Sequence, residues 1–91
     1  MALVSIVIPL YNEIDNIPPL CTALSNVLGG ADAEVIIVDD GSRDGSATAL
    51  DREAETRGVR FKIIHLQRNF GQTAAMQAGI DAAQGDRKSV V

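Results

Sequence analysis

Charged, amide and aromatic side chains gather at three short stretches of this 91-residue sequence, residues 9–13, 39–42 and 68–71. A carboxylate such as that of Asp40 could accept hydrogen bonds from the imide N–H of uracil, or from the N1–H and amino group of guanine. A guanidinium such as that of Arg68 is the natural counter-charge for a diphosphate. Together these side chains predict a binding site for a nucleoside diphosphate.

Several side chains of these stretches suit this ligand, although each has a structural alternative. Tyr11 could lie against the base or the ribose, or it could plug its loop against the core. Glu13 could bond the nucleotide, and Arg68 could instead pair with a carboxylate of residues 39–42. Each stretch taken alone could also be an ordinary turn, because Pro, Asn, Asp and Gly dominate turns. The candidate nucleotide-sugar-binding residues are Pro9, Tyr11, Asn12, Glu13, Asp39, Asp40, Gly41, Ser42 and Arg68.

Two adjacent aspartates, Asp39 and Asp40, come directly after four aliphatic residues. Fixed carboxylates at the end of a strand repel each other and need a compensating role. Ligand binding is one such role, and Gly41 with Ser42 would then let backbone amides approach the ligand. The alternative is that one aspartate caps the following turn.

Three apolar runs predict the strands that position these stretches. Residues 4–8 are β-branched except for Ser5, and Pro9, which has no N–H to donate, should end this strand. Residues 35–38 form an uninterrupted aliphatic run, which is typical of a strand covered on both faces. Residues 59–66 give the third strand. Each predicted strand therefore leads into one of the polar stretches.

A helix is predicted after the first strand. From Ile17 onwards the apolar residues recur at helical spacing, with Asn16 as the expected N-cap and Gly29-Gly30 as the expected end. Cys21 falls on the apolar side of this helix. We therefore expect a buried thiol there rather than a reactive one.

Two more helices are predicted after the second and third strands. Ser46 or Asp44 should cap the second helix, and Gly58 should end it. Gly85 should close the third helix. Its inner face is built from small residues that allow close approach to a sheet, namely Ala75, Ala78, Gly79 and Ala82.

Strand and helix thus alternate three times, which predicts parallel strands because crossover connections are almost always right-handed. The expected fold class is α/β, with a Rossmann-like three-layer parallel sheet. In such sheets ligands bind outside the carboxyl ends of the strands, where the three polar stretches fall. His65 lies inside the third predicted strand. We therefore expect a packed or edge histidine rather than a general base.

The composition excludes several classes of protein. Hydrophobic residues make up 46% of the chain and charged residues 22%, as in soluble globular proteins. The net charge of -4, with acids and bases interspersed, provides no positive face for nucleic acid. No apolar run approaches the roughly 18 residues that cross a bilayer, and no signal-peptide pattern occurs. With a single cysteine as well, the sequence predicts a cytoplasmic protein that does not bind nucleic acid.

Three motifs occur in order along the chain: V-S-I-V-I-P-L-Y-N-E at residues 4–13, V-I-I-V-D-D-G-S-R-D-G at 35–45 and R-N-F-G-Q-T-A-A-M-Q-A-G-I at 68–80. In this order and spacing the chain resembles the family 2 glycosyltransferases. The likeness is greatest to the polyprenyl-phosphate branch, whose members resemble dolichol-phosphate mannosyltransferases and undecaprenyl-phosphate glycosyltransferases. The resemblance covers about nine-tenths of the chain.

This resemblance implies the first three βα units of a GT-A fold that binds a UDP- or GDP-sugar. Pro9, Tyr11, Glu13 and Asp40 would surround the base and ribose, Asp39 would match the first aspartate of the family's pair, and Arg68 would lie near the diphosphate. The reaction implied is inverting transfer of the sugar to an acceptor such as dolichyl or undecaprenyl phosphate. The lipid phosphate attacks already ionised, so no strong base is needed. The full-length parent would act at the cytoplasmic face of a membrane.

The resemblance also implies a divalent metal that this chain does not hold tightly. The family places a D-x-D-type motif for Mg²⁺ or Mn²⁺ on and after the next strand, beyond the last residue here, so no catalytic or metal-binding residue is expected within the chain. Residues 1–85 are interpreted as the N-terminal nucleotide-binding part. Residues 86–91 depart from the family pattern and are interpreted as a non-native or truncated tail.

Two other hypotheses stay open at this point. The chain could be a small non-catalytic α/β module, such as a receiver-like signalling domain, which also carries paired acidic residues at a strand end. A receiver, however, needs its acidic pair after the first strand. The chain could also fold incompletely by itself, and an exposed sheet edge would then favour homo-oligomers.

Overall fold

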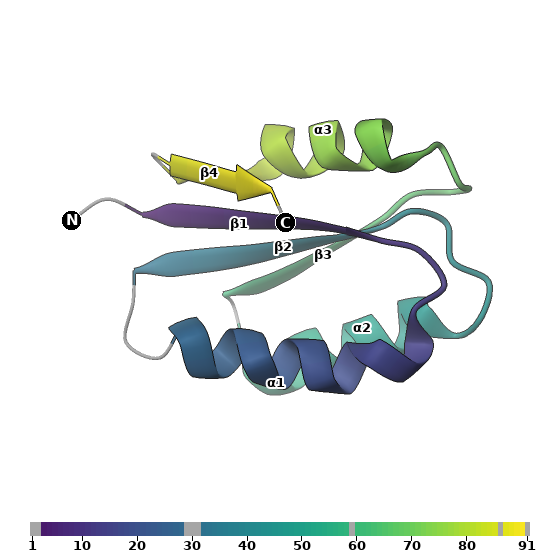
Figure 1. The fold of residues 1–91 in the computed structure, drawn as a ribbon, viewed down its shortest axis with the longest axis horizontal. Coiled ribbons are helices and arrows are strands. Elements are labelled where there is room, and N and C mark those ends of the chain that lie inside the picture. Colours follow the sequence, from purple (N-terminus) through teal and green to yellow (C-terminus); the bar gives the residue numbers. More distant parts are fainter. Residues whose placement is uncertain (1–2, 29–31, 59, 86, 91) are drawn as a thin grey trace.

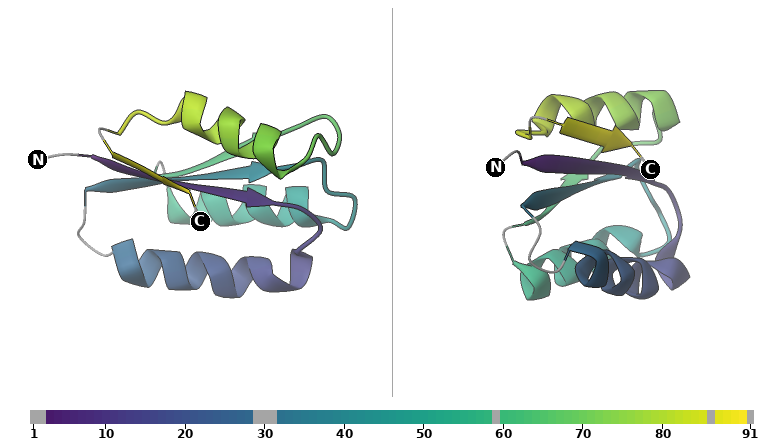
Figure 2. Two further views of the ribbon diagram at one scale, coloured as in Figure 1. Left: turned by 45° about the horizontal axis from the view of Figure 1, so that its top comes forward. Right: turned by 60° about the vertical axis from the view of Figure 1, so that its left-hand side comes forward.

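The computed structural model describes residues 3–28, 32–58, 60–85 and 87–90. A parallel sheet of four strands fills the middle of this part of the chain, with α1 and α2 on one face and α3 on the other (Figures 1 and 2). In chain order the elements are β1 (Val4–Leu10), the 3-10 turn η1 (Ile14–Asn16), α1 (Ile17–Leu28), β2 (Ala33–Asp39), α2 (Ser46–Arg57), β3 (Phe61–His65), α3 (Gln72–Ala82) and β4 (Arg87–Val90). The predicted three-layer, Rossmann-like α/β fold is confirmed.

The register of the sheet brings the ends of three strands level. The strand order is β3-β2-β1-β4, and Leu10 pairs with Asp39, which in turn pairs with His65. These three residues are the last of β1, β2 and β3. The loops that follow them therefore leave the sheet from the same edge, as a parallel sheet with right-handed crossovers requires.

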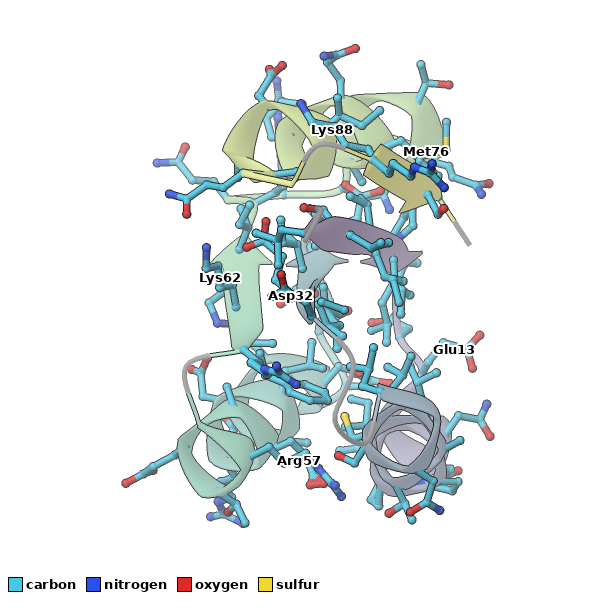
Figure 3. The ribbon with its side chains drawn as sticks, turned by 90° about the vertical axis from the view of Figure 1, so that its left-hand side faces the viewer. Glu13, Asp32, Arg57, Lys62, Met76 and Lys88 are labelled. Carbon is cyan, nitrogen blue, oxygen red and sulfur yellow. The ribbon has the colours of Figure 1, made fainter. Side chains whose placement is uncertain are left out.

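Apolar side chains pack on both faces of the sheet. The larger cluster fills the space under α1 and α2 and includes Ile17, Ile37 and Leu50, all fully buried. Arg57 extends from α2 towards α1, where it donates hydrogen bonds to Ser25 Oγ and Thr22 Oγ1 (Figure 3). These contacts fix the two helices against each other as well as against the sheet.

The face under α3 is smaller and is packed by short side chains. Ala75 is fully buried against Ile36 and Val38 of β2. At Gly79 an added Cβ would lie 2.2 Å from Val7 Cγ1, so α3 approaches β1 too closely for any side chain at this position. The predicted small-residue face is confirmed at Ala75 and Gly79, but Ala82 is exposed and Ala83 packs on the sheet instead.

Cys21 is fully buried in α1, as predicted. Burial is the main cause that raises the pKa of its thiol, which keeps the sulfur in its unreactive protonated form at neutral pH.

The prediction that Pro9 ends the first strand is wrong, because β1 continues to Leu10. Val4 N and Leu10 O form hydrogen bonds on the β2 side of β1. Because the backbone groups of successive strand residues point to alternate sides, Pro9 N faces the side of β1 away from β2. On that side β4 pairs with β1 only as far as Val7. In the described part of β4, therefore, no ladder bond needs an N–H at Pro9, and the strand tolerates it.

The second predicted strand is also longer than its aliphatic run. β2 spans Ala33–Asp39 and is buried throughout, so Asp39 ends the strand rather than opening the loop. The third predicted strand is shorter, since β3 covers Phe61–His65 and Leu66 follows it. His65 is thus an edge-strand residue, as expected. Val59, the predicted start of this strand, lies outside the described residues.

The helix caps differ from the predicted ones. Asn16 belongs to η1, and its side-chain amide donates to the Glu13 carboxylate 2.6 Å away. Gly45, with φ of +94°, is the N-cap of α2, while Asp44 accepts a hydrogen bond from Ser46 N. Gly58 ends α2 as predicted. Gly29 and Gly30 lie outside the described residues.

Gly85 does not close α3, which ends at Ala82. Its N–H donates to Ser5 Oγ over 2.8 Å, and Ser5 Oγ in turn donates to the buried Glu34 carboxylate over 2.6 Å. Glu34 also accepts from Gln84 N at 2.7 Å. These bonds fasten the end of the third βα unit to the amino ends of β1 and β2.

β4 is an element that the sequence did not predict. It pairs in parallel with Val4–Val7 of β1, and all four of its residues are exposed. The interpretation of residues 86–91 as a non-native or truncated tail stays a prediction. In the part of the chain that the structure describes, no helix has the length and apolar character to cross a membrane.

Candidate functional site

The loop after β1 is fastened to the loop after β2. Asn12 N donates to Ser42 Oγ over 2.8 Å, and Asn12 Oδ1 accepts from Arg43 N at 2.8 Å. Asn12 has a φ of +50°, a left-handed conformation that asparagine tolerates better than most residues. Nearby, Glu13 N donates to Ser46 Oγ over 3.2 Å. Two of the predicted site residues, Asn12 and Ser42, therefore hold the two loops together.

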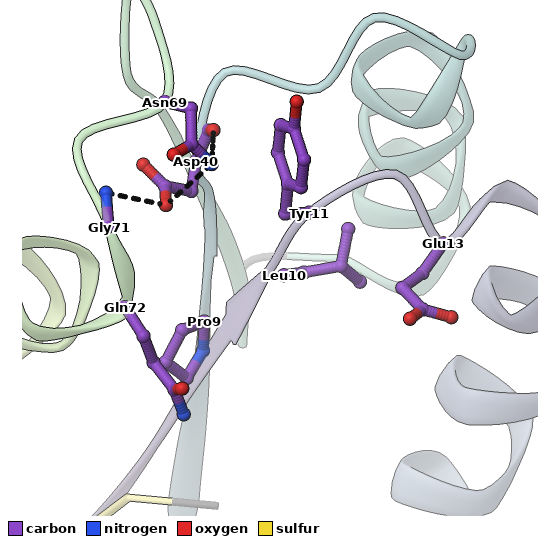
Figure 4. Close-up of a pocket in the computed structure, with 8 residues that line it drawn as sticks. All are labelled: Pro9, Leu10, Tyr11, Glu13, Asp40, Asn69, Gly71 and Gln72. Atoms are coloured by element: carbon purple, nitrogen blue, oxygen red, sulfur yellow. Dashed lines mark hydrogen bonds between the residues drawn. The ribbon is translucent and has the colours of Figure 1, made fainter.

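Asp40 fastens the loop after β3 to the same place. Its carboxylate accepts hydrogen bonds from Gly71 N at 3.1 Å and from the Asn69 side-chain amide at 3.2 Å (Figure 4), and from Phe70 N at 2.8 Å. Asp40 is only 4% exposed. These donors compensate the buried negative charge, as a charge removed from water requires. The carboxylate thereby fixes the start of α3.

Gly41 allows the close contact between these two loops. Its φ is +73°, and an added Cβ would lie 2.2 Å from Arg68 C and 2.5 Å from Asn69 N. Gly41, which was expected to let backbone amides approach a ligand, therefore also makes room for the backbone of the third loop, the one after β3. Arg68 itself is exposed, and its guanidinium lies 4.7 Å from the centre of the Phe70 ring. It does not pair with a carboxylate of residues 39–42 in the hydrogen bonds and ion pairs of the described residues.

A pocket of about 390 Å³ opens beside the Asp40 carboxylate, between the loop after β1 (the first loop) and the loop after β3 (the third loop) (Figure 4). Its lining contains four of the predicted residues and four others, in chain order Pro9, Leu10, Tyr11, Glu13, Asp40, Asn69, Gly71 and Gln72. Tyr11 is 43% exposed, so it forms part of the wall of this pocket rather than a plug in the core. A polar-rimmed pocket of this size is large enough for part of a nucleotide.

Five predicted residues lie around this pocket without lining it, namely Asn12, Asp39, Gly41, Ser42 and Arg68. Four lining residues were not among the predicted site residues. Leu10, Asn69 and Gly71 fall within the predicted stretches 9–13 and 68–71, so their place at the end of a strand could have indicated them. Gln72 carried no such signal, because it is the first residue of α3 and such residues are common everywhere.

Asp39 is almost completely buried next to the pocket and is engaged by protein groups. Its Oδ1 accepts from Ser42 N at 2.9 Å, and its Oδ2 lies 3.0 Å from His65 Nδ1. Burial by itself raises the pKa of Asp39, but the hydrogen bonds from Ser42 and His65 outweigh burial and lower it. Asp39 is therefore a carboxylate at neutral pH, and the repulsion expected between it and Asp40 is offset by separate sets of donors.

A divalent metal has no ready set of ligands here. In residues 3–28, 32–58, 60–85 and 87–90, no three His, Cys, Asp or Glu side chains are grouped as metal ligands would be. The carboxylates of Asp39 and Asp40 already accept hydrogen bonds from within the chain. The described residues thus do not fit a metal centre of their own.

Comparison with protein families gives a match to the model described as "Glycosyl transferase family 2" over residues 5–91. Dodecaprenyl-phosphate galacturonate synthase from Rhizobium johnstonii is 42% identical over 83 residues, which are 89% of this chain and 25% of that protein. Undecaprenyl-phosphate 4-deoxy-4-formamido-L-arabinose transferase from Pseudomonas syringae is 45% identical over 85 residues, 91% of this chain and 25% of that protein. The chain therefore spans about a quarter of the length of these relatives.

Solved structures share the fold. A mannosyltransferase from Pyrobaculum calidifontis, in complex with GDP-Man and Mn2+, superposes with a TM-score of 0.77 at 27% identity, over 93% of this chain and 25% of that one. S. aureus TarS residues 1–349 in complex with UDP gives 0.82 at 23% identity, over 97% of this chain and 26% of that one, a likeness of fold alone. Together with the family match, these likenesses favour the glycosyltransferase hypothesis over the receiver-like module.

Proposed function

The chain belongs to glycosyl transferase family 2, and on that premise we propose that it is the nucleotide-sugar-binding part of an enzyme that transfers a sugar to a polyprenyl phosphate. The observation that carries the proposal is the pocket beside Asp40, at the carboxyl ends of β1 and β2. Ligands of open α/β sheets bind at this edge. The named activities of the relatives, a dodecaprenyl-phosphate and an undecaprenyl-phosphate transferase, support the acceptor class.

We propose that Asp40 both holds the third loop and receives the base. An ionised carboxylate offers about four lone-pair positions, and three protein donors use Asp40 in the described residues. About one position is then left for an imide or amino N–H, and Asp40 lines the pocket. Tyr11, on the pocket wall, is placed to lie against the base or ribose, and Glu13 is placed to accept from a ribose hydroxyl.

The remaining predicted residues take supporting roles in this proposal. Asn12, Ser42 and Asp39 hold the loops through hydrogen bonds, and Gly41 admits the backbone of the third loop. Arg68 is exposed within that loop, so its guanidinium could move to the diphosphate at little cost. Pro9 contributes apolar surface to the pocket.

We propose that the residues holding Mg²⁺ or Mn²⁺ belong to a longer enzyme of the relatives' length, since the described residues offer no such centre. When bound, the metal would neutralise the departing nucleoside diphosphate. An ionised lipid phosphate needs no general base, so a chain without a catalytic histidine is compatible with inverting transfer. A lipid-phosphate acceptor would place this longer enzyme at the cytoplasmic face of a membrane.

The proposal is tested by titrating the purified chain with UDP and with GDP, with and without Mn²⁺, by calorimetry. We expect weak binding of one nucleotide with little dependence on Mn²⁺. Asp40→Ala should abolish it, whereas Asp15→Ala, which removes an exposed carboxylate of η1, should leave it unchanged. Circular dichroism of each variant establishes that it is folded. A folded chain that binds neither nucleotide would contradict the proposal.

A further inference from the structure

His65 lies between two carboxylates at the end of β3. Its Nδ1 is 3.0 Å from Asp39 Oδ2, and its Nε2 is 2.6 Å from Asp51 Oδ1 on α2. These are the charged groups that face His65 among the described residues, one from β2 and one from α2, and both are negative. Spacing along the chain does not connect His65 with the nucleotide site, because Asp51 is 14 residues and Asp39 26 residues away.

The contacts of Asp39 continue from His65 to the first loop. Asp39 Oδ1 accepts from Ser42 N at 2.9 Å, and Ser42 Oγ accepts from Asn12 N at 2.8 Å. Asn12 is flanked by Tyr11 and Glu13, which line the pocket. A continuous series of hydrogen bonds therefore leads from α2 through His65 and Asp39 to the loop that carries two pocket residues.

We propose that His65 is a positioning residue of the nucleotide site, which in its protonated form holds Asp39 and thereby the first and second loops in the conformation that binds nucleotide. This proposal rests on the proposed function and adds a residue to it. His65 does not line the pocket, so it would act through Asp39 rather than on the nucleotide.

The protonation state of His65 determines how many hydrogen bonds its ring can donate to the two carboxylates. An imidazolium has two N–H groups and can donate to Asp39 and Asp51 together, whereas a neutral imidazole has one and must leave one carboxylate facing a lone pair. Burial works to lower the pKa of His65, but the hydrogen bonds and charges of Asp39 and Asp51 outweigh it and raise the pKa. The doubly bonded form therefore persists to higher pH than it would for a histidine without these two carboxylates.

The experiment measures the affinity of the full 91-residue chain for UDP or GDP, whichever nucleotide it binds, from about pH 5.5 to about pH 8.5. We expect affinity to fall about ten-fold as His65 loses its proton, the effect of roughly one hydrogen bond to a charged group. His65→Gln keeps a donor but does not titrate, so its profile reports only the terminal phosphate of the nucleotide, which itself titrates near pH 6. The difference between the two profiles isolates His65.

Asp51→Asn provides a second variant, since the Asp51 side chain is exposed on α2. Removing this carboxylate should lower the pKa of His65 and move the fall in affinity to lower pH. NMR of the His65 ring gives an independent readout. Because linkage is reciprocal, saturation with nucleotide should raise the pKa of His65 by the logarithm of the factor by which protonation raises the affinity.

The outcomes separate this inference from the proposed function. Nucleotide binding with identical pH profiles in the natural chain, His65→Gln and Asp51→Asn would overturn the role of His65 and leave the nucleotide site intact. Binding that leaves the pKa of His65 unchanged would do the same. A folded chain that binds no nucleotide at any pH would overturn both.

Discussion

At the scale of single residues, the candidate site depends on groups whose partners are other parts of the protein. Asp40 is the clearest case, because a carboxylate expected to meet a ligand also accepts three hydrogen bonds from the loop after β3. Asp39 likewise bonds Ser42 and His65. Such internal partners preorganise the loops, so that less ordering remains to be done when a nucleotide binds.

Gly41→Ala should be strongly destabilising. The new Cβ would lie 2.2 Å from backbone carbon of Arg68, which cannot rotate away, and φ at this residue is +73°. We expect a loss of about 3 kcal/mol or more in the free energy of unfolding, measured by urea denaturation.

Gly58→Ala is the matched control for this prediction. Gly58 also has a positive φ, +91°, but an added Cβ there has no neighbour within 4 Å. It should therefore cost only the backbone strain, about 1–3 kcal/mol. Equal losses in the two variants would show that the approach of the loops at Gly41 has no energetic consequence.

At the scale of elements, a buried polar cluster joins the end of α3 to the amino ends of the strands. Glu34 on β2 is 5% exposed and accepts hydrogen bonds from Ser5 of β1 and from Gln84 N after α3. Its other oxygen lies 2.6 Å from Lys62 Nζ on β3. One side chain thus connects β1, β3 and the segment after α3, which fixes where that segment returns to the sheet.

This cluster predicts a loss of stability in acid. Burial alone would raise the pKa of Glu34, but hydrogen bonds, that from Lys62 first, lower it to about 2 from an ordinary value of 4.5. A lowered folded-state pKa stabilises the protein above the unfolded-state pKa, and this stabilisation is lost as pH falls from 4.5 towards 2. The loss should amount to about 3 kcal/mol in urea denaturation experiments.

Glu34→Gln should remove most of this pH dependence and make the protein less stable at neutral pH, because an amide cannot replace the charge that faces Lys62. Glu55→Gln, on the exposed side of α2, should follow the acid dependence of the natural chain. If Glu34→Gln retained the full loss of stability between pH 4.5 and 2, other carboxylates would be its cause.

At the scale of the whole molecule, β4 covers one side of β1 over Val4–Val7, and β3 forms the opposite edge of the described sheet (Figure 1). Removing residues 86–91 should expose the β1 edge to other molecules. We expect the shortened chain to lose about 1–2 kcal/mol of stability and to self-associate at concentrations where the full chain does not. Urea denaturation and light scattering measure the two effects.

Two proline variants separate the loss of pairing from the loss of chain length. Arg87 N donates a hydrogen bond to Leu3 O, so it faces β1. Because backbone N–H groups of successive strand residues point to alternate sides, Ser89 N should also face β1, whereas Lys88 N should face outwards. Ser89→Pro should therefore reproduce the effects of shortening, and Lys88→Pro should have little effect. Similar behaviour of both variants would mean that the β4 ladder does not protect β1.

The sequence by itself determined the order of β1 to β3 and α1 to α3, the three-layer arrangement and the family, because these depend on local hydrophobic patterns and on motifs read along the chain. Pro9, Tyr11, Glu13 and Asp40 were found on this basis, since polar residues after parallel strands must meet at one edge of the sheet. The positions of these loops and the parallel direction of the strands could therefore be inferred from patterns along the chain.

Only the tertiary structure decided which groups are partners. Pro9 stays within β1 because β4 ends before it, Asp40 is held by backbone N–H groups of residues about 30 positions away, and His65 meets Asp39 and Asp51. Backbone donors carry no signature in the sequence, and contacts between distant residues depend on strand register and helix packing. For this reason the sequence indicated where the candidate site lies, and the fold determined which groups each of its side chains contacts.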